Sequence, residues 1–140
     1  MAVKQKDKPN ILVVDDEAEA LKILEKILTK HGYNVLKARN GMEALRVTRK
    51  SNIKLALLDI KLPKMDGIEL LGRFKKVNPD LIVIMITAFG TLKTAIDAMK
   101  LGAYDYITKP FDLNFITSIV EQALEEHDAA SEIGGRPNDL

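Results

Sequence analysis

The sequence contains no cysteine, almost no charge imbalance and no long apolar run. The absence of cysteine excludes disulfides and thiol chemistry and permits a reducing cytosol. With 21 Lys and Arg against 20 Asp and Glu, the net charge of +1 gives no electrostatic reason to expect nucleic acid or an anionic membrane as the main partner. No apolar stretch approaches the roughly 20 residues needed to span a bilayer. The polar first ten residues hold no apolar core of a signal peptide, so we expect none.

What is present is the composition of an ordinary soluble globular domain. The 140 residues suffice for one domain with a real core, and 46% of them are apolar and 29% charged. We expect this domain at residues 10–126. A flexible Lys-rich lead is expected at 1–9, and a linker stub or disordered tail at 127–140, where Gly134, Gly135 and Pro137 stand.

Short apolar runs alternate with amphipathic stretches along the whole domain. Strands are predicted at 11–14, 33–38, 55–58, 81–86 and 104–108, and helices at 18–30, 42–49, 66–77, 91–101 and 113–126. Strict alternation of this kind predicts a parallel sheet with right-handed crossovers and helices on both faces. Glu125 and Glu126 are unfavourable at the negative end of a helix dipole, a weak indication that the last helix continues.

Asp59 stands at the end of the third predicted strand. Four apolar residues, Leu55 to Leu58, run directly into it, as in a strand that is covered on both faces. Open α/β sheets bind their ligands at the carboxyl ends of their strands. Asp59 is therefore a nucleophile, a metal ligand, or merely the residue that ends the strand.

Polar side chains also follow three other predicted strands: Asp15 and Asp16 follow the first, Thr87 the fourth and Lys109 the fifth. Each has an ordinary explanation when taken alone, since an Asp pair after a strand usually caps a helix and Lys-Pro usually marks a turn. The carboxyl ends of parallel strands share one edge, so we expect these side chains and Asp59 to converge. Chance does not explain their joint occurrence well.

Three carboxylates packed together repel, so a proton or a cation must accompany Asp15, Asp16 and Asp59. With oxygen ligands and no His or Cys at these positions, Mg²⁺ is the natural cation. A hydrated Mg²⁺ ion suits a site that receives a phosphoryl group, whose charge Lys109 would partly neutralise and to which the Thr87 hydroxyl would donate. Asp59 would then be the nucleophile that forms an aspartyl phosphate, with catalysis mainly by positioning and electrostatics.

Four motifs of the chain resemble the receiver domain of bacterial two-component response regulators. They are Val13-Val14-Asp15-Asp16-Glu17, Leu58-Asp59-Ile60-Lys61-Leu62-Pro63-Lys64-Met65-Asp66-Gly67, Ile86-Thr87-Ala88, and Gly102-Ala103-Tyr104-Asp105-Tyr106-Ile107-Thr108-Lys109-Pro110-Phe111. The likeness covers about residues 10–126, and the stretches 88–91 and 98–106 look most like receivers of nitrogen-regulatory-type sigma-54 activators. The resemblance implies an α/β, flavodoxin-like, doubly wound sheet of five parallel strands in the order 2-1-3-4-5, with five helices in a three-layer sandwich.

The resemblance also implies how phosphate and metal are held. Asp59 accepts the phosphoryl group from a phosphohistidine of a sensor histidine kinase or phosphotransfer protein. Asp16 ligates Mg²⁺ directly and Asp15 acts through water, while Asp59 and the main-chain carbonyl of Lys61 supply further oxygens.

The remaining implied roles concern the switch. Thr87 and Lys109 hold the phosphoryl oxygens, and Tyr106 is the aromatic residue that turns inward as Thr87 moves toward the phosphate. The Lys109–Pro110 peptide bond is expected to be cis. The side chains of Lys61 and Phe89 are expected to flank the path of an attacking water, so self-hydrolysis would be slow; otherwise Phe89 is simply an aromatic residue of a surface loop.

The implied function is a cytoplasmic signalling switch that is not an enzyme beyond its own phosphotransfer and dephosphorylation. Phosphorylation would change the face formed by residues 91–101, 104–108 and 113–126 and so regulate an output domain or partner, in transcription control. The resemblance allows a phosphorylation-dependent homodimer and gives this domain no direct contact with nucleic acid or membrane. Residues considered for this face are Ala95, Ala98, Met99, Tyr104, Tyr106 and Phe115, although core packing is the better expectation for Ala95 and Met99.

The main alternative is a phosphatase with an aspartyl nucleophile, of the haloacid-dehalogenase type. Such an enzyme needs a second Asp two residues after the nucleophile, where Lys61 stands. It also needs a cap insertion, for which the length leaves no room.

A flavodoxin-like FMN binder is the third interpretation. It would need a phosphate loop rich in Ser, Thr and Gly after the first strand. Asp15-Asp16-Glu17 stands there instead and would repel the cofactor phosphate.

Overall fold

The computed structural model describes residues 8–132. Residues 1–7 of the lead expected at 1–9, and residues 133–140 of the tail expected at 127–140, lie outside the described residues. Five parallel strands form one sheet in the order β2-β1-β3-β4-β5, which confirms the predicted flavodoxin-like topology. The strands are β1 (Asn10–Val14), β2 (Asn34–Ala38), β3 (Leu55–Leu58), β4 (Ile82–Thr87) and β5 (Asp105–Thr108). The helices are α2 (Ala18–Lys30), α3 (Gly41–Lys50), α4 (Gly67–Val77), α5 (Leu92–Lys100) and α6 (Leu113–Glu132).

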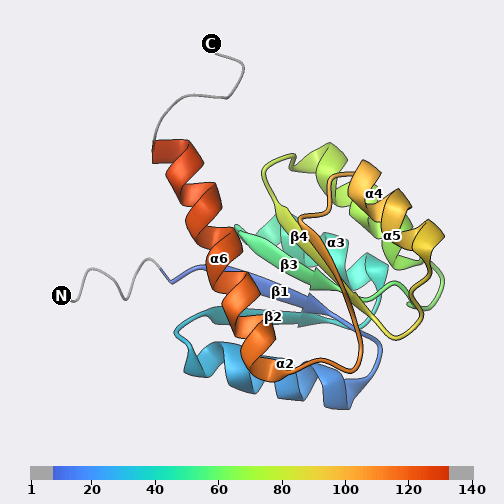
Figure 1. Ribbon diagram of the computed structural model, residues 1–140, viewed down its shortest axis with the longest axis horizontal. Coiled ribbons are helices and arrows are strands. Elements are labelled where there is room, and N and C mark those ends of the chain that lie inside the picture. Colours follow the sequence, from blue (N-terminus) through green and yellow to red (C-terminus); the bar gives the residue numbers. More distant parts are fainter. Residues whose placement is uncertain (1–7, 133–140) are drawn as a thin grey trace, which may run out of the picture.

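Helices cover both faces of the sheet, so the domain has three layers (Figure 1). α2 and α6 pack on one face, and α3, α4 and α5 pack on the other. Successive side chains of a strand point to opposite faces, and in β1 Ile11 joins the α2–α6 core while Leu12 joins the other. Within residues 8–132, no helix has both the length and the apolar character that crossing a membrane requires.

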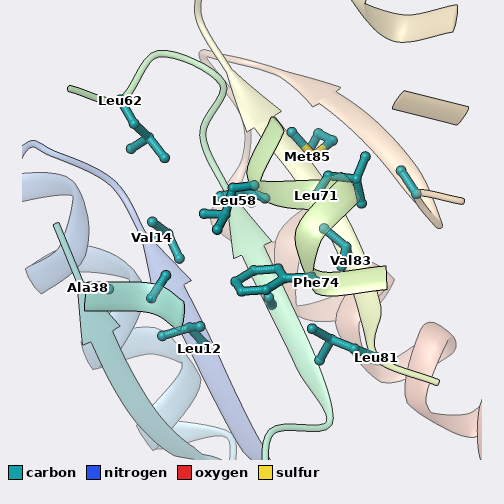
Figure 2. Packing of buried hydrophobic residues seen from close by; sticks show 14 of the residues in the cluster. Leu12, Val14, Ala38, Leu58, Leu62, Leu71, Phe74, Leu81, Val83 and Met85 are labelled. Atoms are coloured by element: carbon teal, nitrogen blue, oxygen red, sulfur yellow. The ribbon is translucent and has the colours of Figure 1, made fainter. Parts of the chain in front are cut away.

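The core beneath α3, α4 and α5 is built mainly from the central strands and α4. Figure 2 shows side chains of β1, β3 and β4 gathered against Leu71 and Phe74 of α4. Every residue of β3 and β4 is buried, as expected for strands covered on both faces. This rigid centre fixes the positions of the strand ends, where the polar residues stand.

Local sequence signals set the helix ends. The side chains of Asn40, Asp66 and Thr91 cap α3, α4 and α5 by accepting hydrogen bonds from backbone N–H groups in the first turn. Gly102 follows α5 with a φ of +100°, a conformation that glycine adopts without strain.

α6 is longer than expected, and the predicted helix end at Glu126 is wrong. The helix continues to Glu132 because residues 127–132 contain Ala129 and Ala130 and neither Gly nor Pro. Glu125 and Glu126, unfavourable at a helix C-terminus, had weakly indicated this continuation. The Tyr104 hydroxyl donates to Glu126 Oε1 at 2.7 Å, and this bond raises the pKa of Tyr104 to about 12. The residue just before β5 thereby anchors α6 at Glu126.

Candidate functional site

The carboxyl ends of β1, β3 and β5 bring Asp15, Asp59 and Lys109 into direct contact. Lys109 Nζ donates to Asp15 Oδ2 at 2.8 Å and to Asp59 Oδ2 at 3.1 Å. The two carboxylate side chains are only 4% and 7% exposed. Lys109 lies 94 and 50 residues away from these partners in the sequence, so the pairing of the strands is what brings the three residues together. The convergence predicted from the strand ends is therefore present for these three residues.

The charges at this edge are unbalanced. Burial disfavours the Lys109 ammonium, but hydrogen bonds and charges from Asp15 and Asp59 outweigh that effect and hold its pKa above the ordinary value. Asp16 is exposed on the same rim. Three carboxylates and one ammonium leave a formal charge of −2, so the edge favours an added cation.

A hollow of about 300 Å³ lies over Asp59. Its lining residues are Asp16, Glu17, Asp59, Lys61, Ala88, Phe89 and Lys109. Lys61 Nζ lies 4.4 Å from the centroid of the Phe89 ring, a cation–π contact that joins two sides of the hollow. The phenylalanine is more than half exposed, so it is both a surface aromatic and part of this wall.

Thr87 lies at the same edge, but the structure does not bring its hydroxyl into the hollow. The residue is fully buried, and its Oγ1 accepts a hydrogen bond from Phe89 N–H at 3.0 Å. Its carbonyl accepts from Lys109 N–H at 2.9 Å, and the following Lys109–Pro110 bond is cis. A contact between the Thr87 hydroxyl and a group bound at Asp59 therefore requires the loop between β4 and α5 to move.

Tyr106, the expected switch residue, is half-buried and packs against the core beneath α5. Its hydroxyl lies 2.7 Å from Thr94 Oγ1. Sequence reasoning did not identify Thr94. The spacing of Thr91 and Thr94 is that of a capping box, which was the available signal.

A rigid turn connects Asp59 to α4. Lys61 N–H donates to Asp59 Oδ1 at 3.1 Å and fixes the carboxylate from the side opposite Lys109. Met65 N–H donates to the Pro63 carbonyl at 2.7 Å, and Lys64 between them has a φ of 71°. This is the rare three-residue turn with positive φ at its centre, which is strained for any residue with a side chain.

Lys64→Gly is expected to raise the free energy of unfolding by roughly 0.5–1 kcal/mol, because glycine relieves the left-handed strain while its more flexible unfolded state cancels part of the gain. Urea denaturation measures the change. Lys26→Gly, at an exposed position inside α2, is the matched control and should lose about 1 kcal/mol. If both variants lost the same free energy of unfolding, the backbone at Lys64 would not be strained.

Sequence reasoning also missed Arg39, which follows β2. Its Nη2 donates to the Asp16 carbonyl at 2.8 Å, and its own N–H donates to Glu43 Oε1 at 2.8 Å. Arg39 thus joins the loop that carries Asp16 to the start of α3. No motif in the sequence marks this contact.

The donor chemistry at the edge fits a hard divalent cation, although within residues 8–132 no group of three or more His, Cys, Asp or Glu side chains is arranged as it stands to hold a metal ion. Asp15 and Asp59 are buried oxygen donors that share a single ammonium, and Asp16 is a third carboxylate on the rim. Carboxylates with room for water are the ligands that Mg²⁺ prefers. Binding would require Lys109 to give up part of its contact with them.

The exposed side of α5 carries an apolar row. Leu92, Ile96 and Met99, spaced four and three residues apart, are each exposed by 45% or more. The expectation that Met99 packs in the core is wrong, because Ala98 is the residue of α5 that turns inward. Ala95 is half-buried. Nearby, Phe115 of α6 is 48% exposed, so the α5-β5-α6 face presents apolar surface to solvent.

The chain is similar to known proteins in sequence and in fold. The model of the response regulator receiver domain matches residues 11–121. The chain is 40% identical over 118 residues to the transcriptional regulatory protein ZraR of Escherichia coli K12, covering 84% of this chain and 27% of that protein. It is 40% identical over 114 residues to sporulation initiation phosphotransferase F of Bacillus subtilis, covering 81% of this chain and 92% of that protein.

Among solved structures, the chain superposes on a chain of the CheX–CheY–BeF3–Mg complex of Borrelia burgdorferi with a TM-score of 0.77 and 34% identity, covering 83% of this chain and 89% of that one. The chain thus spans nearly all of a single-domain relative and about a quarter of a transcriptional regulator. The matches agree with the predicted likeness to receivers of sigma-54 activators. The chain belongs to the response regulator receiver domain family of two-component signalling.

Proposed function

We propose that this chain is a phosphorylation-dependent signalling switch that accepts a phosphoryl group on Asp59 from a histidine kinase or phosphotransfer protein. The observation that carries the proposal is the position of Asp59, whose carboxylate lies at the base of an open hollow and is held by Lys109 and by Lys61 N–H. A carboxylate held at both oxygens is oriented for attack and has little reorganisation left to undergo. Membership of the receiver family supports this assignment.

The phosphoryl transfer forms one bond and breaks one. An Asp59 carboxylate oxygen forms the new P–O bond, and the P–N bond of the donor phosphohistidine breaks, its electron pair leaving with the imidazole. Lys109 already lies 3.1 Å from Asp59 Oδ2, so its ammonium can follow the charge onto a phosphoryl oxygen. An apolar hollow of about 570 Å³ beside Lys109, with Ile23 of α2 and Phe111 in its wall, gives a protein donor a surface to contact.

Mg²⁺ is the cofactor that this proposal requires. Asp15, Asp16 and Asp59 would hold it, together with the Lys61 carbonyl, and when bound it would neutralise charge on the phosphoryl oxygens. The net charge of these side chains and a Mg-containing complex of a related receiver support the assignment. Lys109 and Mg²⁺ would divide the negative charge of the phosphorylated site between them.

The output would be a change at the α5-β5-α6 face. Thr87 would leave Phe89 N–H and move toward the phosphate, drawing the loop before α5 with it and letting Tyr106 turn inward. Phosphorylation would thus bias two conformations of the exposed apolar row and allow it to contact an output domain, a partner or a second copy. The similarity to ZraR, a transcriptional regulatory protein, supports a role in transcription control. We propose that this domain itself makes no direct contact with nucleic acid. We propose no catalysis beyond its own phosphotransfer and dephosphorylation.

Phe89→Ala is expected to shorten the lifetime of the phosphoryl group roughly threefold to tenfold, since it removes the ring that covers the hollow beside Lys61 and opens the water path. The decay of the phosphorylated mass after removal of the donor measures the lifetime. Phe115→Ala, which removes a ring that is 48% exposed and lies outside the hollow, should leave the lifetime unchanged. A lifetime that Phe89→Ala does not shorten would count against the covering role.

The proposal is tested by incubating the chain with acetyl phosphate and Mg²⁺ and measuring the intact mass. We expect the added mass of one labile phosphoryl group on the wild type, none on Asp59→Asn, and none when EDTA removes the metal. Size-exclusion chromatography of the same samples reports any dimer that forms on phosphorylation. A wild type that gains no mass would refute the proposed function.

A further inference from the structure

We propose that the hydroxyls of Tyr106 and Thr94 form a latch that holds the first turn of α5 in the resting state, and that phosphorylation at Asp59 opens it. The trigger rests on the proposed function, whereas the latch rests on the geometry of the unphosphorylated chain. The latch couples the start of α5 to the side chain of Tyr106, so that the two change together between a closed and an open state. The exposed apolar row on α5 would move with it.

The contacts around Thr94 Oγ1 favour Tyr106 as the donor. Thr94 Oγ1 lies 3.0 Å from Thr91 N, 3.0 Å from Thr91 O, 3.2 Å from Thr91 Oγ1 and 2.7 Å from Tyr106 Oη. A hydroxyl has one proton and two acceptor positions. Thr91 N–H fills one acceptor position, and the proton goes to the Thr91 carbonyl. Two hydroxyls, those of Thr91 and Tyr106, compete for the remaining acceptor position. The Tyr106 hydroxyl is the nearer, so we assign its proton to Thr94.

The same threonine closes the start of α5. Thr91 and Thr94 form a reciprocal capping box, and Ala95 N–H donates to the Thr91 carbonyl at 3.0 Å. α5 has only nine residues, and Ala98 is its only buried one. Little apolar packing therefore holds this helix, and a single hydrogen bond from the sheet is a large part of what fixes its first turn.

Gly90 leaves the space that the latch needs. A Cβ atom at this position would lie 2.6 Å from Tyr106 Oη and 3.0 Å from its Cε1 atom, so a larger residue would displace the ring. Gly90 also stands between Phe89, whose N–H binds Thr87, and the cap at Thr91. Movement of Thr87 toward a phosphoryl group would pull this short loop across the Tyr106 hydroxyl.

Amide hydrogen exchange of Ala95, measured by NMR on the unphosphorylated chain relative to the core amide of Ile84, tests the latch. Tyr106→Phe removes only the hydroxyl and leaves the capping box intact. We expect Ala95 to exchange about threefold to tenfold faster, the effect of losing one net hydrogen bond. Tyr104→Phe is the matched control, since its hydroxyl binds Glu126 on α6, and it should leave Ala95 unchanged. No acceleration in Tyr106→Phe, or equal acceleration in both variants, would overturn the latch.

Two further arms separate the latch from its trigger. Gly90→Ala should accelerate Ala95 exchange as Tyr106→Phe does, and unchanged exchange would contradict the steric role of the glycine. With Mg²⁺ and acetyl phosphate, the wild type should approach the exchange rate of Tyr106→Phe. A wild type that carries the phosphoryl group and keeps its slow exchange would overturn the trigger. A wild type that takes up no phosphoryl group would refute the proposed function. The Ala95 exchange rates of the unphosphorylated variants would still test the latch in that case.

Discussion

Gly67→Ala is expected to lower the free energy of unfolding by about 3 kcal/mol, the upper range for forcing extra atoms into a packed site. A Cβ atom at this position would lie 2.2 Å from the Asp59 carbonyl oxygen and 2.6 Å from Ile60 Cα. Both are backbone atoms of the segment that carries Asp59, so no side-chain rotation relieves the overlap. Because Gly67 N–H also binds the Ile60 carbonyl, the backbone must shift there, and phosphorylation should slow at least tenfold. Urea denaturation and the rate of mass gain measure the two effects.

Gly72→Ala gives the control for Gly67→Ala within the same helix. Gly72 lies inside α4, and a Cβ atom added there would meet no atom within 4 Å apart from the adjoining backbone of the helix itself, so alanine should stabilise the protein by roughly 0.5–1 kcal/mol. The two substitutions are chemically identical and differ only in what surrounds them. If both stabilise the protein, the close approach of α4 to the Asp59 strand does not constrain the site.

Lys109→Met should cost about 3 kcal/mol at neutral pH, because it leaves Asp15 and Asp59 buried side by side with no cation. Denaturation at low ionic strength without Mg²⁺ measures the loss. Lys93→Met is the control, since the Lys93–Asp97 pair on α5 is largely exposed and should contribute less than about 1 kcal/mol. Similar losses in the two variants would show that burial does not matter at the Asp15–Asp59 edge.

The stability difference between the wild type and Lys109→Met should depend on pH in a defined direction. The pKa of Lys109 is raised above 10.5 in the folded chain, because its partners outweigh the effect of burial. Its contribution to stability is therefore complete below about pH 10.5 and is lost as the pH rises through the folded-state pKa. The gap between the wild type and Lys109→Met should narrow above that pH. A gap that widens there would contradict the ion pair.

Strand ends were the most predictable part of the molecule. Asp15, Asp59 and Lys109 directly follow predicted strands, so they meet at one edge if the strands are parallel. The sheet order followed from the family resemblance. Contacts that depend on side-chain rotamers were not predictable in this way. The Thr87 hydroxyl turns to Phe89 N–H instead of the hollow, a choice made by the loop after β4.

Other differences have equally local causes. Met99 was expected inside because it is apolar, but α5 is short and turns only Ala98 fully inward, so Met99 reaches solvent. Arg39 and Thr94 matter through bonds to Asp16 and Tyr106, which lie 23 and 12 residues away and carry no sequence pattern that links the partners. Such pairs become visible only when the tertiary structure places them together.

The central claim, that Asp59 is the phosphoacceptor, is tested most directly by locating the acyl phosphate. After incubation with acetyl phosphate and Mg²⁺, borohydride reduces an aspartyl phosphate to homoserine, and peptide mass mapping identifies the position. We predict homoserine at position 59 in the wild type and none anywhere in Asp59→Asn. Homoserine at position 15 or 16, or its complete absence from the wild type, would contradict the account.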